Sequence, residues 1–184
     1  LDGLGMTMEG LGTNPIVPDF VMDQVWRTRV PDVTAWTRDY IARRYGQPNP
    51  SAWSAWQLLL ASAFRSPQQT GNFLAERPQF YLKDRRYRSE PVPPYPDSLL
   101  AAALDSLLAA APALGGNDAY RYDVVNLTRQ VLALRGLPLV QAVERAYRAG
   151  DRTALRAAEG KVLEMIRDLD ALSATRPPVA RSRP

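Results

Sequence analysis

Apolar residues recur at intervals of three and four along most of the chain, which is the spacing of one face of an α-helix. The pattern predicts a first helix that runs to about Arg27, with Asn14 as its N-cap and Pro15 at its first position. A second helix is expected to begin after Asp32 and to end before Gly46. No segment after residue 12 alternates as a strand does, so the sequence predicts a mainly α fold.

Proline and glycine separate the helices that follow. Ser51 is expected to open a third helix, and Asp97 to cap an alanine- and leucine-rich helix that ends near Ala111. Residues 66–96 lie between these two helices and hold six prolines. An irregular connection of this length is typical of a functional segment or of one packed on another part of the protein.

Two further helical patterns occupy the C-terminal part. The first spans residues 120–134, and Gly136 and Pro138 are predicted to kink or split the helix there, because proline lacks an amide donor and crowds the preceding turn. Asp151 is expected to cap the last helix. The apolar positions of that helix keep a three-four spacing: Leu155, Val162, Ile166 and Leu169.

Most aromatic and acidic side chains have structural explanations. The tryptophans fall at helical spacing on apolar faces, where core packing is expected; they are Trp26, Trp36, Trp53 and Trp56. The aspartates of the helical region are expected to be caps or solvated positions: Asp19, Asp23, Asp32, Asp39, Asp97 and Asp151.

The composition narrows the possible chemistry. The 184 residues suit one domain of ordinary size, and 46% hydrophobic with 23% charged residues is typical of a globular protein. The sequence contains neither cysteine nor histidine. This excludes disulfides, thiolate nucleophiles, Cys/His zinc sites and imidazole acid–base catalysis. Proton transfer by this chain must therefore use carboxylates, tyrosine, arginine or lysine, and no metal site is predicted.

The net charge of +4 does not indicate a nucleic-acid partner, because arginines alternate with acids along the helical segments. The basic run at residues 83–88 is expected to be a solvated loop. No apolar run approaches the roughly 18 residues of a membrane span, so no membrane partner is predicted. No signal-peptide pattern is visible after Leu1, and we expect the chain to be the tail of a longer gene product.

Two segments are candidates for function. Glu9 lies in a glycine-flanked, apolar stretch without a capping role or a counter-charge nearby in sequence. Glycines let backbone approach a ligand, and barrel enzymes present catalytic groups at strand ends before a helix. Both a catalytic carboxylate and an exposed loop glutamate fit this pattern. The second segment, residues 120–130, mixes polar and apolar groups on the same helix faces, which indicates a buried hydrogen-bonded network that serves either structure or a site.

These two segments resemble parts of the α-N-acetylglucosaminidases of glycoside hydrolase family 89. Residues 3–15 are similar to the family's Gly-Met-x-x-Glu-Gly-x-x-x-Asn segment. Further matching motifs follow in the family's order as far as about residue 177: Trp26-Arg27, Trp36, Ala42-Arg43-Arg44-Tyr45-Gly46, Ala55-Trp56-Gln57-Leu58-Leu59-Leu60, Arg77-Pro78, Arg121-Tyr122-Asp123-Val124-Val125-Asn126-Leu127-Thr128-Arg129-Gln130 and Leu169-Asp170-Ala171-Leu172.

The resemblance implies a fold and an activity. In that family a (β/α)8-type barrel with two catalytic glutamates precedes an all-α domain, and terminal α-linked N-acetylglucosamine is removed with retention and without a metal or organic cofactor. By this resemblance residues 1–28 are a short remnant of the barrel's C-terminal end, and residues 29–184 begin an incomplete all-α domain. Glu9 matches the nucleophile, and Val125 matches a substrate-binding position that lines the pocket.

The resemblance supplies only half of a catalytic pair, since nothing in the chain matches the family's acid/base. We therefore expect the acid/base to lie outside this chain, in the missing barrel portion, and the chain alone to be inactive. The expected partner is an N-acetylglucosamine-containing glycan. Family members are lysosomal in animals and often exported in bacteria, which implies an extracytoplasmic or lysosome-like compartment. The alternative interpretation is a non-catalytic α-helical interaction module.

Overall fold

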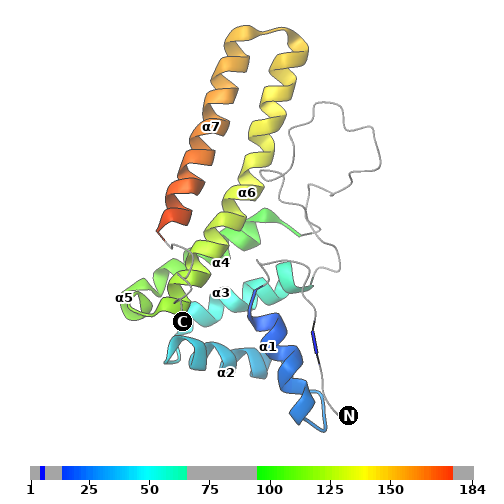
Figure 1. The fold of residues 1–184 in the computed structure, drawn as a ribbon, viewed down its shortest axis with the longest axis vertical. Helices are drawn as coiled ribbons and strands as arrows, with labels where there is room; N and C mark the ends of the chain where they lie inside the picture. Colours follow the sequence, from blue (N-terminus) through cyan, green and yellow to red (C-terminus); the bar gives the residue numbers. More distant parts are fainter. Residues whose placement is uncertain (1–4, 7–13, 66–94, 176–184) are drawn as a thin grey trace, which may run out of the picture. The chain divides into compact units, whose positions relative to one another are not determined.

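The computed structural model describes residues 5–6, 14–65 and 95–175, and the regular elements in these ranges are helices, without a β-strand (Figure 1). This confirms the mainly α fold; the barrel remnant predicted at residues 1–28 is neither confirmed nor contradicted by it. The chain forms two compact units, Leu1–Pro48 and Asn49–Pro184.

The first unit contains α1 (Ile16–Asp23), a 3-10 turn η1 (Gln24–Trp26) and α2 (Val33–Tyr45). The prediction of Asn14 as the N-cap of α1 is wrong, since Pro15 is the N-cap; Asn14 Oδ1 accepts a hydrogen bond from the amide of Ile16 at 3.1 Å. The N-cap Asp32 of α2 likewise accepts from Ala35 N at 2.7 Å. Gly46 ends α2 with a φ of 78°, a left-handed conformation that favours glycine.

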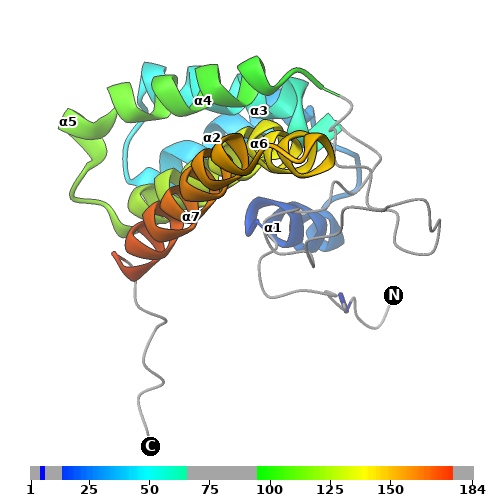
Figure 2. The same ribbon diagram turned by 90° about the horizontal axis from the view of Figure 1, so that it is seen from above.

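The second unit is built of five α-helices and a 3-10 turn within its described residues. They are α3 (Pro50–Ala61), η2 (Ala63–Arg65), α4 (Asp97–Ala109), α5 (Ala111–Leu114), α6 (Asp118–Ala149) and α7 (Arg152–Ala174). Helix α4 lies between α3 and the N-terminal half of α6, and α7 runs back along the C-terminal half of α6 (Figures 1 and 2).

The core of the second unit lies between α3, α4 and α6. Small side chains let α3 and α4 approach closely, because Ala52, Ala55 and Ala103 are each fully buried. Around them the large side chains of the core reach 1% exposure or less: Trp56, Leu100, Leu107 and Leu114.

A buried hydroxyl ties α6 to α4. Tyr120 is 3% exposed, and its hydroxyl donates a hydrogen bond to the Leu107 carbonyl at 2.7 Å. Burial raises the pKa of this phenol above its ordinary value. The neutral, donating form of Tyr120 is therefore the one that the fold favours.

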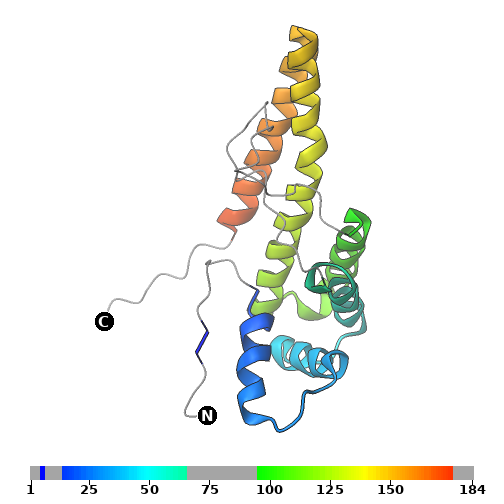
Figure 3. The same cartoon turned by 90° about the vertical axis from the view of Figure 1, so that its right-hand side faces the viewer.

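Helices α6 and α7 form a long antiparallel hairpin, which Figures 1 and 3 show extending away from α3 and α4. Gly150 makes the turn with a φ of 68°, and the predicted N-cap Asp151 accepts from the amides of Thr153 and Ala154 at 3.0 and 2.9 Å. The half-buried side chains of α7 recur every three or four residues along the seam with α6: Leu155, Ala158, Val162, Met165, Leu169 and Leu172.

Gly136 and Pro138 were predicted to kink or split the helix, and of these two outcomes the split is wrong, since α6 continues through both residues to Ala149. Proline in a helix interior costs about 3 kcal/mol, because it removes one hydrogen bond and crowds the previous turn. Here the helix is packed on both sides of the proline, with Val131 and Ala133 buried before it and Val143 buried after it. Packing of the flanking turns therefore holds the helix continuous.

Two helix starts also need correction. Helix α3 begins at Pro50 with Asn49 as its N-cap, one residue earlier than the predicted opening at Ser51. The N-cap of α4 is Pro96 rather than Asp97.

Trp26, which the helical spacing predicts in the core, is instead 87% exposed. The reason is local, because α1 ends at Asp23 and the residues after it form a 3-10 turn. A 3-10 turn advances by three residues per turn rather than 3.6, so the apolar face of α1 does not continue to Trp26. Of the other tryptophans, Trp36 and Trp56 are buried and Trp53 is half-buried.

Candidate functional site

Of the two predicted site residues, Glu9 lies outside the described residues, and Val125 lies on α6. The first described residue after the Glu9 segment is Asn14, whose Oδ1 accepts a hydrogen bond from Ile16 N in α1. Val125 is half-buried in the N-terminal half of α6. The structure therefore places Val125 on α6 and leaves the position of Glu9 outside the described residues.

Within the first unit, two carboxylates of α1 are bonded to two aromatic residues of α2. Trp36 Nε1 donates to Asp23 Oδ2 at 2.7 Å, and the Tyr40 hydroxyl donates to Asp19 Oδ2 at 3.0 Å. The rings of Trp36 and Tyr40 are stacked 5.0 Å apart, and Phe20 meets Trp36 edge-on at 4.9 Å. We call these five residues the α1–α2 clamp.

The spacing of the clamp could have been found in the sequence. Asp19 and Asp23 are four residues apart, as are Trp36 and Tyr40, so each pair lies on one face of its helix. Interpreting each aspartate as a cap or a solvated position missed this match. The clamp holds α1, the helix that leads out of the Glu9 segment, against α2.

The clamp is structural and is not a glycosidase carboxylate pair. Such a pair needs one carboxyl that stays protonated near neutral pH, with a raised pKa. A hydrogen bond from Arg27 Nε at 2.6 Å, and then the one from Trp36, hold the pKa of Asp23 below its ordinary value. Asp23 is thus kept ionised, and Asp19 also acts as an acceptor.

The polar groups of the 120–130 segment are satisfied within the fold. Besides the Tyr120 hydroxyl, Thr128 Oγ1 donates to the Val124 carbonyl at 2.7 Å, and Arg121 Nε donates to the Gly115 carbonyl at 2.6 Å. Asp123 is 5% exposed, and among the described residues no buried side-chain polar atom lacks a hydrogen-bond partner. These bonds favour a structural role for the polar residues of the network. A role in a binding site would then belong to the apolar residues of the same segment.

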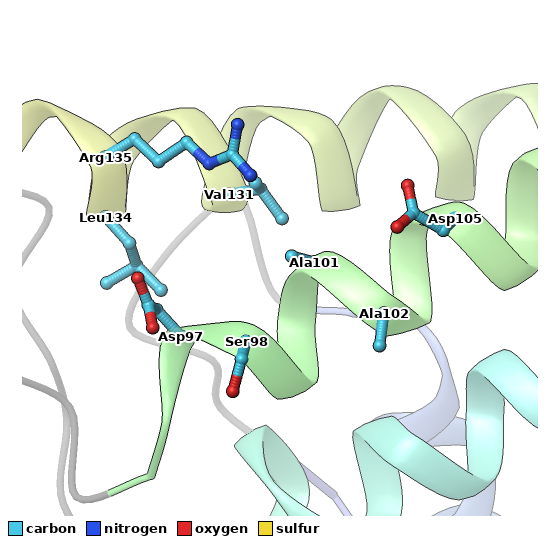
Figure 4. Close-up of a pocket in the computed structure, with 8 residues that line it drawn as sticks. All are labelled: Asp97, Ser98, Ala101, Ala102, Asp105, Val131, Leu134 and Arg135. Atoms are coloured by element: carbon cyan, nitrogen blue, oxygen red, sulfur yellow. The ribbon is translucent and has the colours of Figure 1, made fainter.

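A groove of about 350 Å³ lies between α4 and α6 (Figure 4). Its middle is apolar, and the carboxylates of Asp97 and Asp105 stand at its two ends on α4, with the Arg135 guanidinium across from them on α6. Eight residues of α-helix separate the two carboxylate-bearing positions by about 12 Å along the axis. This is wider than the roughly 5–9.5 Å between the carboxyls of glycosidases, so the groove does not hold such a pair.

Within residues 5–6, 14–65 and 95–175, no cluster of three or more acidic side chains is arranged to hold a metal ion. None of the helices in these ranges combines the length and hydrophobicity needed to cross a membrane. The described residues thus offer structural contacts and a groove, but no assembled catalytic centre.

Comparison with known proteins identifies the family. The family model described as the alpha-N-acetylglucosaminidase (NAGLU) C-terminal domain matches residues 36–180. The chain is 34% identical over 142 residues to human alpha-N-acetylglucosaminidase, an alignment that covers 71% of this chain and 17% of the human protein.

Two solved structures from Clostridium perfringens have the same fold. One is CpGH89 with two glutamates replaced by glutamine, in complex with its substrate GlcNAc-α-1,4-galactose; it has a TM-score of 0.82 and 26% identity, covering 91% of this chain and 19% of that one. The other is a family 89 glycoside hydrolase in complex with 2-acetamido-1,2-dideoxynojirimycin, with a TM-score of 0.81, 25% identity and coverage of 89% and 19%.

This chain spans less than a fifth of the length of each of these relatives. The family model nevertheless covers most of the chain, and the resemblance to family 89 found in the sequence is confirmed. The chain belongs to the family of alpha-N-acetylglucosaminidase C-terminal domains.

Proposed function

We propose that this chain is a portion of a retaining glycosidase that hydrolyses terminal α-linked N-acetylglucosamine. In this proposal Glu9 is the nucleophile, and the acid/base lies in a barrel portion outside the chain. Residues 1–28 form the end of that barrel, and residues 29–184 begin the all-α domain. Val125 lines the sugar pocket from α6.

The observation that carries the proposal is the match of fold and sequence to an enzyme in complex with its substrate. A TM-score of 0.82 over 91% of this chain relates it to CpGH89, whose substrate is GlcNAc-α-1,4-galactose. The 34% identity to human alpha-N-acetylglucosaminidase supports the same activity independently. An N-acetylglucosamine-containing glycan is therefore the substrate class that we assign.

The mechanism divides between two carboxyls. A retaining glycosidase uses one ionised carboxylate to attack the anomeric carbon and one protonated carboxyl to assist the leaving group, roughly 5–5.5 Å apart. Glu9 supplies the first in our proposal. Its neighbours Gly5 and Gly10 leave the backbone free to approach a sugar.

The first test concerns the chain by itself. The purified 184-residue chain should not turn over an aryl α-N-acetylglucosaminide, because one carboxylate cannot provide both attack and protonation. The release of the aryl group is followed by absorbance, with the solvent-only rate as the baseline. Turnover above that baseline would contradict the placement of the acid/base outside the chain.

The second test uses an enzyme that contains this chain together with the upstream barrel. Glu9→Gln should reduce turnover by about 10⁴-fold or more while the circular dichroism spectrum and melting temperature stay unchanged. Asp19→Asn is the matched control, since Asp19 is a carboxylate ten residues along the chain that serves the α1–α2 clamp. Near-native turnover by Glu9→Gln, or an equal loss in Asp19→Asn, would refute the nucleophile assignment.

The alternative, a non-catalytic α-helical interaction module, has one observation in its favour. Large apolar side chains are exposed on α7, with Leu163 at 51% and Ile166 at 45%. An exposed apolar face indicates a surface that binds another helix, whether or not the protein is also part of an enzyme.

A further inference from the structure

Helix α6 has a weak point near its middle, at Gly136 and Pro138. Proline has no amide hydrogen, so the Leu134 carbonyl cannot receive the helical hydrogen bond from residue 138, and the proline ring crowds that same turn. Glycine, two residues earlier, is a poor helix former. The structure nevertheless keeps α6 helical through both residues. Because sharp bends in helices occur mainly at such residues, this turn is the place where α6 bends most easily.

The weak point coincides with a change in the packing of α6. Leu134 lies opposite Asp97, the first residue of α4 (Figure 4). Beyond that level, α7 is the extensively packed neighbour of α6 among the described residues, and Figure 1 shows the two helices extending away together. The base of the hairpin is therefore held by the core. The tip, which we define as residues 139–159, is held by the pairing of α6 with α7.

Helix α7 has a weak point of its own at the same level. Gly160 lies inside α7, and a Cβ added there would meet nothing within 4 Å. No close contact therefore requires a glycine at this position, and glycine weakens a helix interior relative to alanine. Counted from the turn at Gly150, Pro138 lies 12 residues back and Gly160 ten residues on, about 18 and 15 Å along their helices. The two weak points are thus within one helical turn of each other.

Pro138 and Gly160 also lie on the outer sides of the hairpin. Pro138 is exposed, and the buried Val143 lies about 140° around α6 from it. Gly160 is exposed, and Ala158 and Val162 of the seam each lie about 160° around α7 from it. Pro138 is therefore on the side of α6 that faces away from α7, and Gly160 is on the side of α7 that faces away from α6.

This placement gives the bend a direction. The crowding by a proline ring is relieved when the helix bends away from the ring. Since the ring is on the outer side of α6, the tip leans toward the side of α7. The outer side of α7 then becomes the inside of the bend, where Gly160 has no side chain to be crowded.

We propose that the α6–α7 hairpin has a hinge formed by Gly136 and Pro138 in α6 and by Gly160 in α7. The tip moves as one body relative to the base and leans toward the side of α7. Val125 lies on the base, 11 residues before Gly136, so this movement leaves the proposed wall of the sugar pocket in place. The hinge therefore does not rest on the proposed function.

Residual dipolar couplings of the backbone amides test the hinge in the intact chain under weak alignment, because they report the orientation and the degree of order of each helical segment. Residues 119–135 of α6 represent the base, and residues 139–149 represent the tip. Excursions of about 20° at the hinge should lower the degree of order of the tip by about one tenth or more relative to the base. The mean axis of the tip should be inclined toward α7.

A double variant tests which residues form the hinge. Pro138→Ala restores the amide donor, and Gly160→Ala adds a methyl group in open space. Together they should raise the degree of order of the tip to that of the base. Pro112→Ala with Gly116→Ala is the matched control, because it makes the same two changes outside the hairpin, and a Cβ at Gly116 also meets nothing within 4 Å. The control should leave the tip as mobile as in the native chain.

Three results would overturn the proposal. The couplings of base and tip in the native chain could fit a single rigid alignment, the tip could incline away from α7, or the variant with Pro138→Ala and Gly160→Ala could keep the lower order of the native tip. An equal gain of order in the control would also overturn it, since the effect would then not belong to the hinge. None of these results depends on glycosidase activity, so this proposal and the proposed function can fail separately.

Discussion

Helices α4 and α7 are both amphipathic, yet they occupy opposite situations in the same unit. Helix α4 lies between two helices, and Leu100, Ala103 and Leu107 on it are at most 1% exposed. Among the described helices, α7 packs extensively against α6 only. None of the residues of α7 is fully buried. Apolar periodicity thus shows that a helix has a face to cover, and only the structure shows how much of it is covered.

The sharpest test of this comparison makes the same change in both helices. Leu100→Ala should lower the free energy of unfolding by about 2–5 kcal/mol, because it leaves a cavity in the core formed by α3, α4 and α6. Leu163→Ala should change it by no more than about 0.5 kcal/mol, because the side chain is half exposed. Urea unfolding followed by circular dichroism measures both.

One result of this pair of substitutions would contradict the account. If Leu163→Ala were as destabilising as Leu100→Ala, the Leu163 side chain would be packed within the chain. The described difference between α4 and α7 would then be wrong.

A smaller loss of stability is expected from changes at the two ends of α6. Its N-terminal end packs in the core, and its C-terminal end belongs to the hairpin with α7. Tyr120→Phe removes the donor to the Leu107 carbonyl and should cost about 1–2 kcal/mol. Tyr147→Phe makes the same change on a residue that is 50% exposed and should cost no more than about 0.5 kcal/mol. Equal losses in thermal or urea unfolding would show that the two ends of α6 are equally buried.

The smallest effect concerns a contact held by charge rather than by burial, the α1–α2 clamp. Because the pKa of Asp23 is lower in the folded chain than in the unfolded chain, its ionised form stabilises the clamp above about pH 4. That contribution is lost as the pH falls through the lowered pKa. The indole N–H resonance of Trp36 in an NMR titration should therefore shift with a midpoint below about pH 4.

The matched variants separate this titration from others nearby. Asp23→Asn should abolish the transition of the Trp36 resonance, whereas Asp39→Asn, an exposed aspartate on α2, should leave it unchanged. A midpoint at the ordinary value of an aspartate, or one that survives in Asp23→Asn, would show that the clamp does not depend on this carboxylate.

The sequence predicted the elements whose causes are local. Asp32 and Asp151 bond amides two or three residues away, so their caps follow from neighbouring residues alone. The continuity of α6 through Pro138 could not be predicted this way, because it depends on neighbours that are distant in sequence. The exposure of Trp26 was missed because one 3-10 turn changes the helical spacing.

The features of the candidate site also differ in how far the sequence could predict them. The partners of the clamp are 13 and 21 residues apart, and only their matched spacing hints at them in the sequence. Glu9 and Val125 were singled out with the help of family resemblance, and their roles stay predictions. No physical property of Val125, half-buried on α6, distinguishes a pocket residue from a packing one.

The assignment of Glu9 as the nucleophile of a retaining enzyme has its decisive test in the product of a rescue reaction. In an enzyme that contains this chain and the barrel, Glu9→Ala removes the attacking carboxylate, and azide can enter in its place to attack the anomeric carbon. We predict that azide restores cleavage of an aryl α-N-acetylglucosaminide and that proton NMR shows the β-glycosyl azide. An α-glycosyl azide would instead give Glu9 the acid/base role, and undiminished hydrolysis without azide would remove it from the mechanism.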